Sequence, residues 1–203
     1  MTTPASRAAT MKYRTALLFG APGVGKGTQG KILGTIPSFF HCACGDVFRS
    51  LRLDSDLGHI FADYSSKGLL VPDEPTIRLW RQFIDASEQT GRFNPETDLL
   101  ILDGIPRNVR QAEMLQDTLD VKAIFYLTCP VQEKLIERIQ RRALRENRLD
   151  DANLEVIRAR LQTYEQESRP VLEYYGPKTL RPVDAAKSPV GVLHDILGVL
   201  QSI

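Results

Sequence analysis

The sequence predicts an α/β protein of three layers, in which helices cover both faces of a five-stranded parallel sheet. Three observations support this fold class. Short apolar runs alternate with helical patterns, no internal repeat occurs, and no linker is long enough to divide the chain. With 203 residues, 42% of them hydrophobic and 25% charged, the chain suits one globular domain over residues 11–203.

Five short apolar runs, each bounded by turn or charged residues, are the expected strands. They lie in the segments 15–19, 37–44, 99–102, 121–127 and 179–183. Ligands of parallel sheets bind beyond the carboxyl ends of the strands. Gly20, Asp46 and Asp103 each follow such an end. The predicted site therefore lies along that edge of the sheet.

The segments between the strands have helical spacing. The expected helices cover residues 25–35, 47–53, 57–65, 74–88, 109–119, 131–145, 154–174 and 190–200. In the fourth of these, Ile77, Trp80 and Ile84 recur at steps of three and four residues, which predicts an amphipathic helix with Trp80 in the core. The second and third form a small helical insert after the second strand.

A glycine-rich segment follows the first strand directly. Its sequence is Gly20-Ala21-Pro22-Gly23-Val24-Gly25-Lys26-Gly27-Thr28. Glycines let the backbone curl with its N–H groups inward, the following helix favours anions at its N-terminus, and Lys26 adds a mobile cation. The segment is therefore predicted to bind phosphate. Gly27 stands where Ser or Thr is usual in this pattern, and Thr28 comes one residue late.

Asp103 ends the third apolar run, across the sheet crevice from the phosphate loop. A carboxylate at that place can hold Mg²⁺ directly or through water, and Asp46 could assist it. The alternative is that Asp103 only caps a turn. The neighbouring phosphate loop favours the magnesium role.

Arginines are the second chemical signal, because guanidinium groups stabilise the charge of a phosphoryl group in transit. Five of them fall within eleven residues, namely Arg138, Arg141, Arg142, Arg145 and Arg148. Such a run is often a solvated face or a nucleic-acid stripe. The near-neutral net charge of +1 favours phosphate clamping instead. Arg49 and Arg107, each just past a strand end, are expected to hold a second phosphate-bearing ligand.

Composition excludes several other classes. The net charge of +1 predicts no nucleic-acid or membrane partner, and no apolar run reaches the length of a membrane span. Without the apolar core of a secretory signal, a cytoplasmic location is expected, with residues 1–10 as a disordered extension. Three cysteines cannot form a disulfide framework, and the cluster His41-Cys42-Ala43-Cys44 has no partner cluster for zinc.

At these residues the sequence resembles the nucleoside monophosphate kinases, and the adenylate kinases in particular, nearly from end to end. The stretches that carry the resemblance are the loop from Gly20 through Gln29, Cys44-Gly45-Asp46-Val47-Phe48-Arg49, Gly68-Leu69-Leu70-Val71-Pro72-Asp73, Leu102-Asp103-Gly104-Ile105-Pro106-Arg107 with Gln111 four residues later, the pair Arg138 and Arg142, and Arg148-Leu149-Asp150-Asp151 with Arg160. Gly27 followed by Thr28 is normal in these kinases. The displaced hydroxyl is therefore a mark of the family.

The resemblance implies reversible, Mg²⁺-dependent phosphoryl transfer from ATP to AMP, giving two ADP without a covalent enzyme intermediate. The residues it implies for ATP are Gly23, Val24, Gly25, Lys26, Gly27, Thr28, Arg138 and Arg142. Those for AMP are Cys44, Arg49, Leu70, Val71, Gly104, Arg107, Gln111, Arg148 and Arg160. The catalytic set is Lys26, Arg107, Arg138, Arg148 and Arg160, with Asp103 organising Mg²⁺ through water.

The resemblance also implies two mobile parts. They are a monophosphate-binding insert over about residues 44–73 and a lid over about residues 138–149. Only about five residues separate Arg142 from Arg148, so the lid is the short kind, without the zinc-binding cysteines of some relatives. Both parts are expected to close over the substrates, because water in the site would hydrolyse ATP.

Two positions bear on the acceptor. Cys44 stands where the family has a hydroxyl residue that hydrogen-bonds the monophosphate, and a thiol is a weaker donor. Asn108 is typical of pyrimidine monophosphate kinases, whereas Gln111 can present a paired donor and acceptor to an adenine edge. Gln111 favours AMP, so ATP, AMP and ADP are the expected partners of a monomeric enzyme. A UMP/CMP kinase and a non-catalytic nucleotide sensor are the alternatives.

Overall fold

The fold is known from a computed structural model that describes residues 12–52, 54–146, 148, 151 and 153–203. Its sheet consists of β1 (Tyr13–Phe19), β2 (Phe39–Ala43), β3 (Leu99–Asp103), β4 (Leu119–Thr128) and β5 (Leu180–Asp184). The strands lie in the order β2-β3-β1-β4-β5, and every neighbouring pair is parallel. The predicted five-stranded parallel sheet is confirmed. The predicted extension over residues 1–10 lies outside the described residues.

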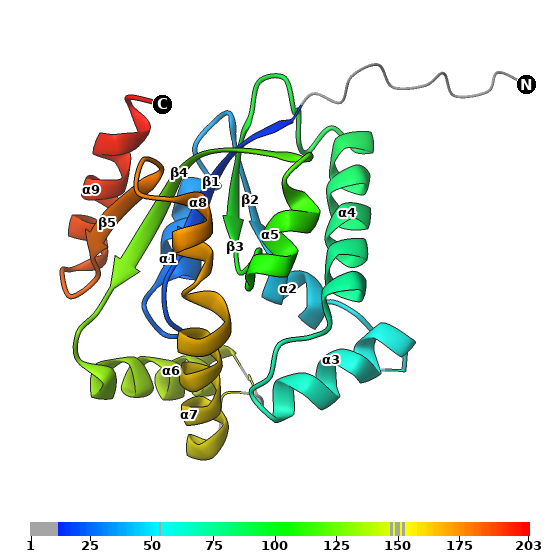
Figure 1. The fold of residues 1–203 in the computed structure, drawn as a ribbon, viewed down its shortest axis with the longest axis vertical. Helices are drawn as coiled ribbons and strands as arrows, with labels where there is room; N and C mark the ends of the chain where they lie inside the picture. The colour runs from blue at the N-terminus through cyan, green and yellow to red at the C-terminus, as the bar shows by residue number, and fades with distance from the viewer. Residues whose placement is uncertain (1–11, 53, 147, 149–150, 152) are drawn as a thin grey trace, which may run out of the picture.

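The helices are α1 (Lys26–Leu33), α2 (Cys44–Arg49), α3 (Asp56–Ser66), α4 (Asp73–Gln89), α5 (Val109–Leu115), α6 (Gln132–Glu146), α7 (Leu154–Thr163), α8 (Val171–Tyr175) and α9 (Pro189–Leu200). A π-helical turn, Tyr164–Ser168, follows α7 directly and precedes α8. Figure 1 shows α3, α6 and α7 together beyond one edge of the sheet. Among the described residues, no helix is both long and apolar enough to cross a bilayer.

Strand β1 faces a core on each side of the sheet. Leu17 and Phe19 belong to one buried cluster, while Ala16 and Leu18 belong to the other. Successive side chains of a strand point to opposite faces, so a continuous apolar run requires helices on both. Each fully buried aliphatic side chain contributes roughly 1.5–3 kcal/mol. The apolar run that predicted β1 is thus explained by its central position.

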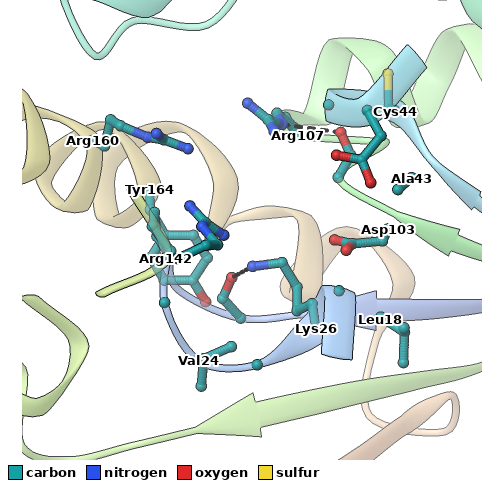
Figure 2. A pocket seen from close by; sticks show the side chains of 18 of the residues that line it. Leu18, Val24, Lys26, Ala43, Cys44, Asp103, Arg107, Arg142, Arg160 and Tyr164 are labelled. Carbon is teal, nitrogen blue, oxygen red and sulfur yellow. Dashed lines mark hydrogen bonds between the residues drawn. The ribbon is translucent and has the colours of Figure 1, made fainter. Parts of the chain in front are cut away.

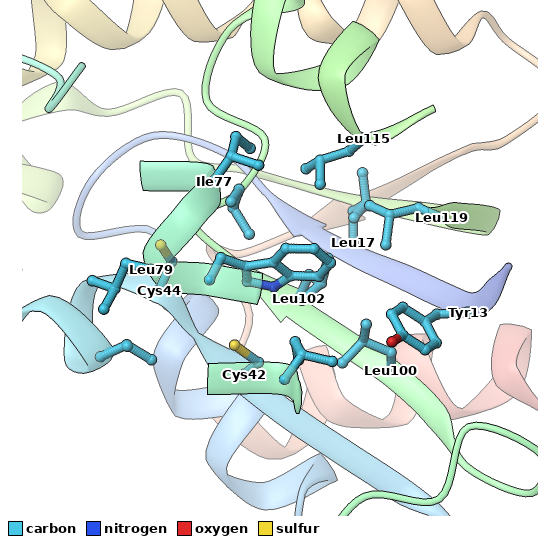
Figure 3. Close-up of a cluster of buried hydrophobic side chains, with 14 of the residues drawn as sticks. Tyr13, Leu17, Cys42, Cys44, Ile77, Leu79, Leu100, Leu102, Leu115 and Leu119 are labelled. Carbon is cyan, nitrogen blue, oxygen red and sulfur yellow. The ribbon is translucent and has the colours of Figure 1, made fainter. Parts of the chain in front are cut away.

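Helix α4 packs its buried side chains into the first cluster. Ile77 and Leu79 of α4 belong to the same buried cluster as Leu100 and Leu102 of β3 (Figure 3). Trp80, predicted as a core residue, is 1% exposed, so that prediction is confirmed. The second cluster includes side chains of α1, α6, α7 and α9.

Register aligns the strand ends that carry the site. In the parallel pairing, Asp103 of β3 lies opposite Leu18 of β1 and opposite Ala43 of β2. The chain leaves β1 into the glycine loop and leaves β2 directly into α2 at Cys44. The loop, Cys44 and Asp103 therefore meet at the carboxyl edge, as the sequence predicts.

Three predicted helix boundaries are wrong. The helix expected over residues 109–119 ends at Leu115, because Leu119 pairs with Tyr13 and opens strand β4. The helix expected over residues 47–53 is α2, which begins at Cys44 and ends at Arg49.

The long helix expected over residues 154–174 is interrupted. The Arg169 N–H donates to the Tyr164 carbonyl at 2.9 Å, which makes a π turn. Pro170 follows and has no N–H to continue the ladder. Because π turns occur often at functional sites, the location of Tyr164 becomes informative.

Candidate active site

One cavity of about 730 Å³ lies at the carboxyl edge of the sheet. Every site residue expected from the sequence borders it, namely Gly23, Val24, Gly25, Lys26, Gly27, Thr28, Cys44, Arg49, Leu70, Val71, Asp103, Gly104, Arg107, Gln111, Arg138, Arg142, Arg148 and Arg160. Figure 2 shows Arg107, Arg142 and Arg160 directed toward the region above Lys26 and Asp103. Residues from distant parts of the chain are thus brought together around one space.

The glycine loop owes its shape to backbone angles that other residues avoid. Gly20, Gly23 and Gly25 have φ angles of 138°, 81° and 110°. A Cβ on Gly20 would lie 2.3 Å from the carbonyl oxygen of Leu127 in β4. Gly25 precedes α1 without a side-chain cap, and the first turn of α1 contains no acidic residue. The first N–H groups of α1 therefore suit an anion.

Lys26 lies folded over the same loop. Its Nζ donates to the carbonyl oxygens of Gly20 at 2.6 Å and Ala21 at 3.1 Å. The pKa of Lys26 is lowered to about 8, because burial lowers it more than the charge of Asp103 raises it, and the charge of Arg107 also lowers it. The partners of the ammonium group are neutral carbonyls, so a phosphate oxygen would offer it a stronger, charge-assisted hydrogen bond.

Asp103 lies against the start of α1. A Cβ on Gly27 would be 3.5 Å from its Oδ2. In the part of the chain that the structure describes, no group of three His, Cys, Asp or Glu side chains could hold a metal ion. Mg²⁺ is usually held by one or two carboxylates, several waters and the phosphates of a substrate. The single carboxylate Asp103 beside the phosphate loop fits that mode of binding.

Buried Asp151 pairs with two arginines that border the cavity. It forms ion pairs with Arg142 and Arg160, and its side chain is 0% exposed. Arg138 donates through both terminal nitrogens to the carbonyl oxygen of Ala185 at 3.2 Å. A buried carboxylate is tolerated only with such partners. Residues 147, 149 and 150, next to or within the segment 148–151, lie outside the described residues.

Asp46 of α2 accepts hydrogen bonds from two arginines, one of them distant in the sequence. Its Oδ1 accepts hydrogen bonds from Arg49 at 2.7 Å and Arg148 at 3.2 Å. Burial raises the pKa of this carboxyl, but the hydrogen bond and charge of Arg49 and the charge of Arg148 outweigh burial and lower it. The structure thus gives Asp46 two arginine partners, and its assistance to Mg²⁺ stays a prediction.

Arg107 and Gln111 are held by backbone contacts. The Arg107 Nε donates to the Gly104 carbonyl at 3.0 Å, and Gly104 has a φ angle of 81°. The backbone N–H of Arg107 donates to Gln111 Oε1 at 2.7 Å.

Cys44 is 3% exposed, and burial raises the pKa of its thiol to about 11. The thiol is therefore neutral at physiological pH.

Asn108 has a structural task. Its Oδ1 accepts from the backbone N–H of Gln111 at 2.8 Å, which caps α5, and its Nδ2 donates to Asp73 Oδ1 at 2.8 Å. Asn108 is not among the described residues that border the cavity. The presence of Asn108 is thus explained without a contact to a pyrimidine base.

Sequence reasoning missed two residues of the site. Asp73 accepts from Gln111 Nε2 at 2.9 Å and so supports a cavity-lining side chain. Tyr164 borders the cavity near Arg142 (Figure 2), and burial raises the pKa of its hydroxyl. Asp73 was marked only as the end of a segment that the resemblance placed near the acceptor base, and nothing in the sequence marked Tyr164.

A phosphate loop, a strand-end carboxylate and two groups of arginines around one cavity are the parts of a phosphoryl-transfer enzyme. A family model for adenylate kinase matches residues 18–180. An adenylate kinase of Thermoanaerobacter sp. (strain X514) is 35% identical to this chain over 89% of it and 94% of the relative. The protein is accordingly a nucleoside monophosphate kinase.

Two further relatives define how close the resemblance is. An adenylate kinase of Cyanothece sp. (strain PCC 7425 / ATCC 29141) is 39% identical over 78% of this chain and 80% of its own. A UMP-CMP kinase of Danio rerio is 32% identical over 94% of this chain and 98% of its own. The chain belongs to the adenylate kinase family, since the family model covers most of its length.

Proposed function

We propose that this enzyme transfers a phosphoryl group reversibly from MgATP to AMP and so produces two molecules of ADP. The observation that carries the proposal is the cavity itself. It is bordered on one side by the glycine loop and Lys26, and on another by Arg107 and Gln111. One space with two anion-binding sides suits two nucleotides held for direct transfer.

In the proposed mechanism an oxygen of the AMP phosphate attacks the γ-phosphorus of ATP, and the bond from that phosphorus to the β–γ bridging oxygen breaks. The loop N–H groups and Lys26 hold the donor phosphates, with Arg138 and Arg142 on the donor side. Arg49 and Arg107 hold the AMP phosphate. Mg²⁺ bound with the ATP phosphates would neutralise charge, and Asp103 would hold its water ligands.

The remaining arginines are assigned to the moving group. Arg148 and Arg160 border the same cavity and would neutralise charge on the equatorial oxygens of the transferred phosphoryl group. Asp46 positions Arg148 and Asp151 positions Arg160, each through an ion pair. The insert over residues 44–73 and the short lid over residues 138–149 would close to exclude water. A cytoplasmic location and a monomeric state remain predictions from the sequence.

Initial rates with MgATP and each of AMP, UMP, CMP and GMP test the acceptor. We expect AMP to give the highest kcat/KM. Equal or better turnover of UMP would overturn the proposal in favour of a UMP/CMP kinase. Binding of ATP without transfer to any of the four would instead indicate the sensor.

Replacement of Arg107 tests the acceptor side of the mechanism. Arg107→Ala should lower kcat/KM for AMP by about 100-fold or more, because a charge-assisted contact to the phosphate is removed. Arg110→Ala is the matched control, since Arg110 is exposed on α5 only three residues away. Near wild-type kinetics for Arg107→Ala would refute its role.

A further inference from the structure

The carboxylate of Asp73 lies behind the acceptor side of the cavity. It is the first residue of α4, and its Oδ1 accepts from Asn108 Nδ2 at 2.8 Å and from Gln111 Nε2 at 2.9 Å. Gln111 is 1% exposed and borders the cavity. Asp73 and Asn108 are not among the described residues that border it. Asp73 therefore acts on the cavity through Gln111.

Two partners of opposite kind fix the orientation of the Gln111 carboxamide. A carboxylate only accepts hydrogen bonds, so the group that faces Asp73 must be the –NH₂. A backbone N–H only donates, so the group that faces the Arg107 nitrogen, at 2.7 Å, must be the carbonyl oxygen. A flipped amide would set acceptor against acceptor at Asp73 and donor against donor at Arg107.

The fixed amide keeps part of its hydrogen-bonding capacity. The two contacts use one of its two N–H groups and one of its two lone pairs. One donor and one acceptor, in a set order, remain for a ligand in the cavity. A purine with an amino group at position 6 offers a donor beside the acceptor N1. A 6-oxo purine offers the reverse order, an acceptor beside the donor N1–H.

We propose that Asp73 is a specificity-determining positioning residue. By holding the Gln111 carboxamide in one orientation, it makes the acceptor site select 6-amino purine nucleotides over 6-oxo purine nucleotides. The inference rests on the proposed function, because it assumes that the base of the acceptor monophosphate meets Gln111. AMP and inosine monophosphate are the sharpest pair of probes, since they differ only in this edge of the base.

The test compares kcat/KM for AMP with kcat/KM for inosine monophosphate, using MgATP as donor. In Asp73→Asn the new amide can donate as well as accept, so Gln111 is free to turn. We expect the preference for AMP to fall by about tenfold, the size of one lost bidentate contact. Glu74→Gln removes the same charge from the first turn of α4, at an exposed side chain, and should leave the preference unchanged within about twofold.

Two further variants make the outcome decisive. Gln111→Ala should abolish the preference. Asp73→Ser, whose hydroxyl suits a helix N-terminus, replaces Asp73→Asn if thermal melting shows that the amide variant is unfolded. If wild type turns over UMP better than AMP, the proposed function fails and this inference fails with it. If wild type prefers AMP and Gln111→Ala abolishes that preference, but the Asp73 variants keep it or Glu74→Gln lowers it equally, the inference alone is overturned.

Discussion

The two halves of the cavity are built by different means. On the proposed donor side, the glycine loop is shaped by its backbone: Gly20, Gly23 and Gly25 have positive φ angles, and the partners of Lys26 lie five and six residues away. The proposed acceptor half consists of side chains from distant segments. Asp73 reaches partners 35 and 38 residues away, and Arg148 contacts a residue 102 positions away.

The difference teaches how each half should respond to mutation. A backbone loop has few conformations that other residues can copy, so a single Cβ can displace a strand. A side-chain network distributes its energy over several ion pairs and hydrogen bonds, each worth about 1 kcal/mol or less at a partly exposed site. We therefore expect single substitutions in the glycine loop to cause a large loss of folding stability, and single substitutions in the side-chain network of the acceptor half to cause smaller losses.

Gly20→Ala should have the largest effect. Its Cβ would lie 2.3 Å from a backbone oxygen of β4, at a φ of 138°. Conformational strain and overpacking of about 1–3 kcal/mol each predict a loss near 4 kcal/mol and a fall in Tm of about 10 °C. Gly91→Ala is the matched control, because Gly91 also has a positive φ, 69°, but nothing lies within 4 Å of its Cβ. An equal loss of stability in both variants would show that strain alone, and not the contact with β4, explains the effect.

The pKa of Lys26 gives the next effect. A value of about 8 in the free enzyme means that the ammonium loses its proton above that pH. Because kcat/KM reports the free enzyme, kcat/KM for ATP should fall about tenfold per pH unit above pH 8. Lys26→Arg keeps its charge and should show lower activity without this limb. If kcat/KM still falls above pH 8 in Lys26→Arg, another titrating group causes the fall.

Stability should change with pH in the opposite direction. Between the folded pKa of about 8 and the ordinary 10.5, the unfolded chain binds a proton that the folded protein has lost. The contribution of Lys26 to the free energy of unfolding therefore rises with pH in this window. The difference in free energy of unfolding between wild type and Lys26→Met, measured by urea unfolding from pH 7 to 10, isolates that contribution.

The fold could be predicted from the sequence for a physical reason, whereas cavity residues such as Leu70, Val71 and Gln111 were predicted only from the resemblance to the adenylate kinases. Apolar runs such as residues 99–102 specify buried strands, and parallel strands bring their carboxyl ends together whatever the loops do. Helix ends were less predictable. The stop at Leu115 depends on pairing between Leu119 and Tyr13, which is a contact with a distant strand.

The hydrogen-bond partners that position the side chains of the site could not be predicted from the sequence either. Asp46 follows a strand end, and nothing in the sequence indicated that its carboxylate accepts hydrogen bonds from Arg49 and Arg148. Asp73 ended a segment that the resemblance placed near the acceptor base, but nothing in the sequence indicated its contacts with Asn108 and Gln111. An isolated carboxylate gives no sign of which distant cation or amide it will meet, because that choice is made by tertiary packing.

The contact between Asp46 and Arg148 gives the smallest effect and tests what governs such pairs. Its atoms are 3.2 Å apart, whereas the pair Arg52–Asp54 on the same insert is tighter, at 2.7 Å. Exposure ranks them in the opposite order: the side chains of Arg148 and Asp46 are 11% and 44% exposed, and those of Arg52 and Asp54 are 83% and 67% exposed. Solvent screening weakens exposed pairs, so burial and not distance should decide.

Double-mutant cycles on the free energy of unfolding separate these two factors. The cycle of Asp46→Asn with Arg148→Gln should give a coupling of about 0.5 kcal/mol, a value already reduced for the partial exposure of Asp46. The cycle of Asp54→Asn with Arg52→Gln should give no measurable coupling, despite the shorter distance. Stronger coupling in the exposed pair would mean that local geometry outweighs burial. The acceptor half would then depend on close contacts as strictly as the glycine loop does.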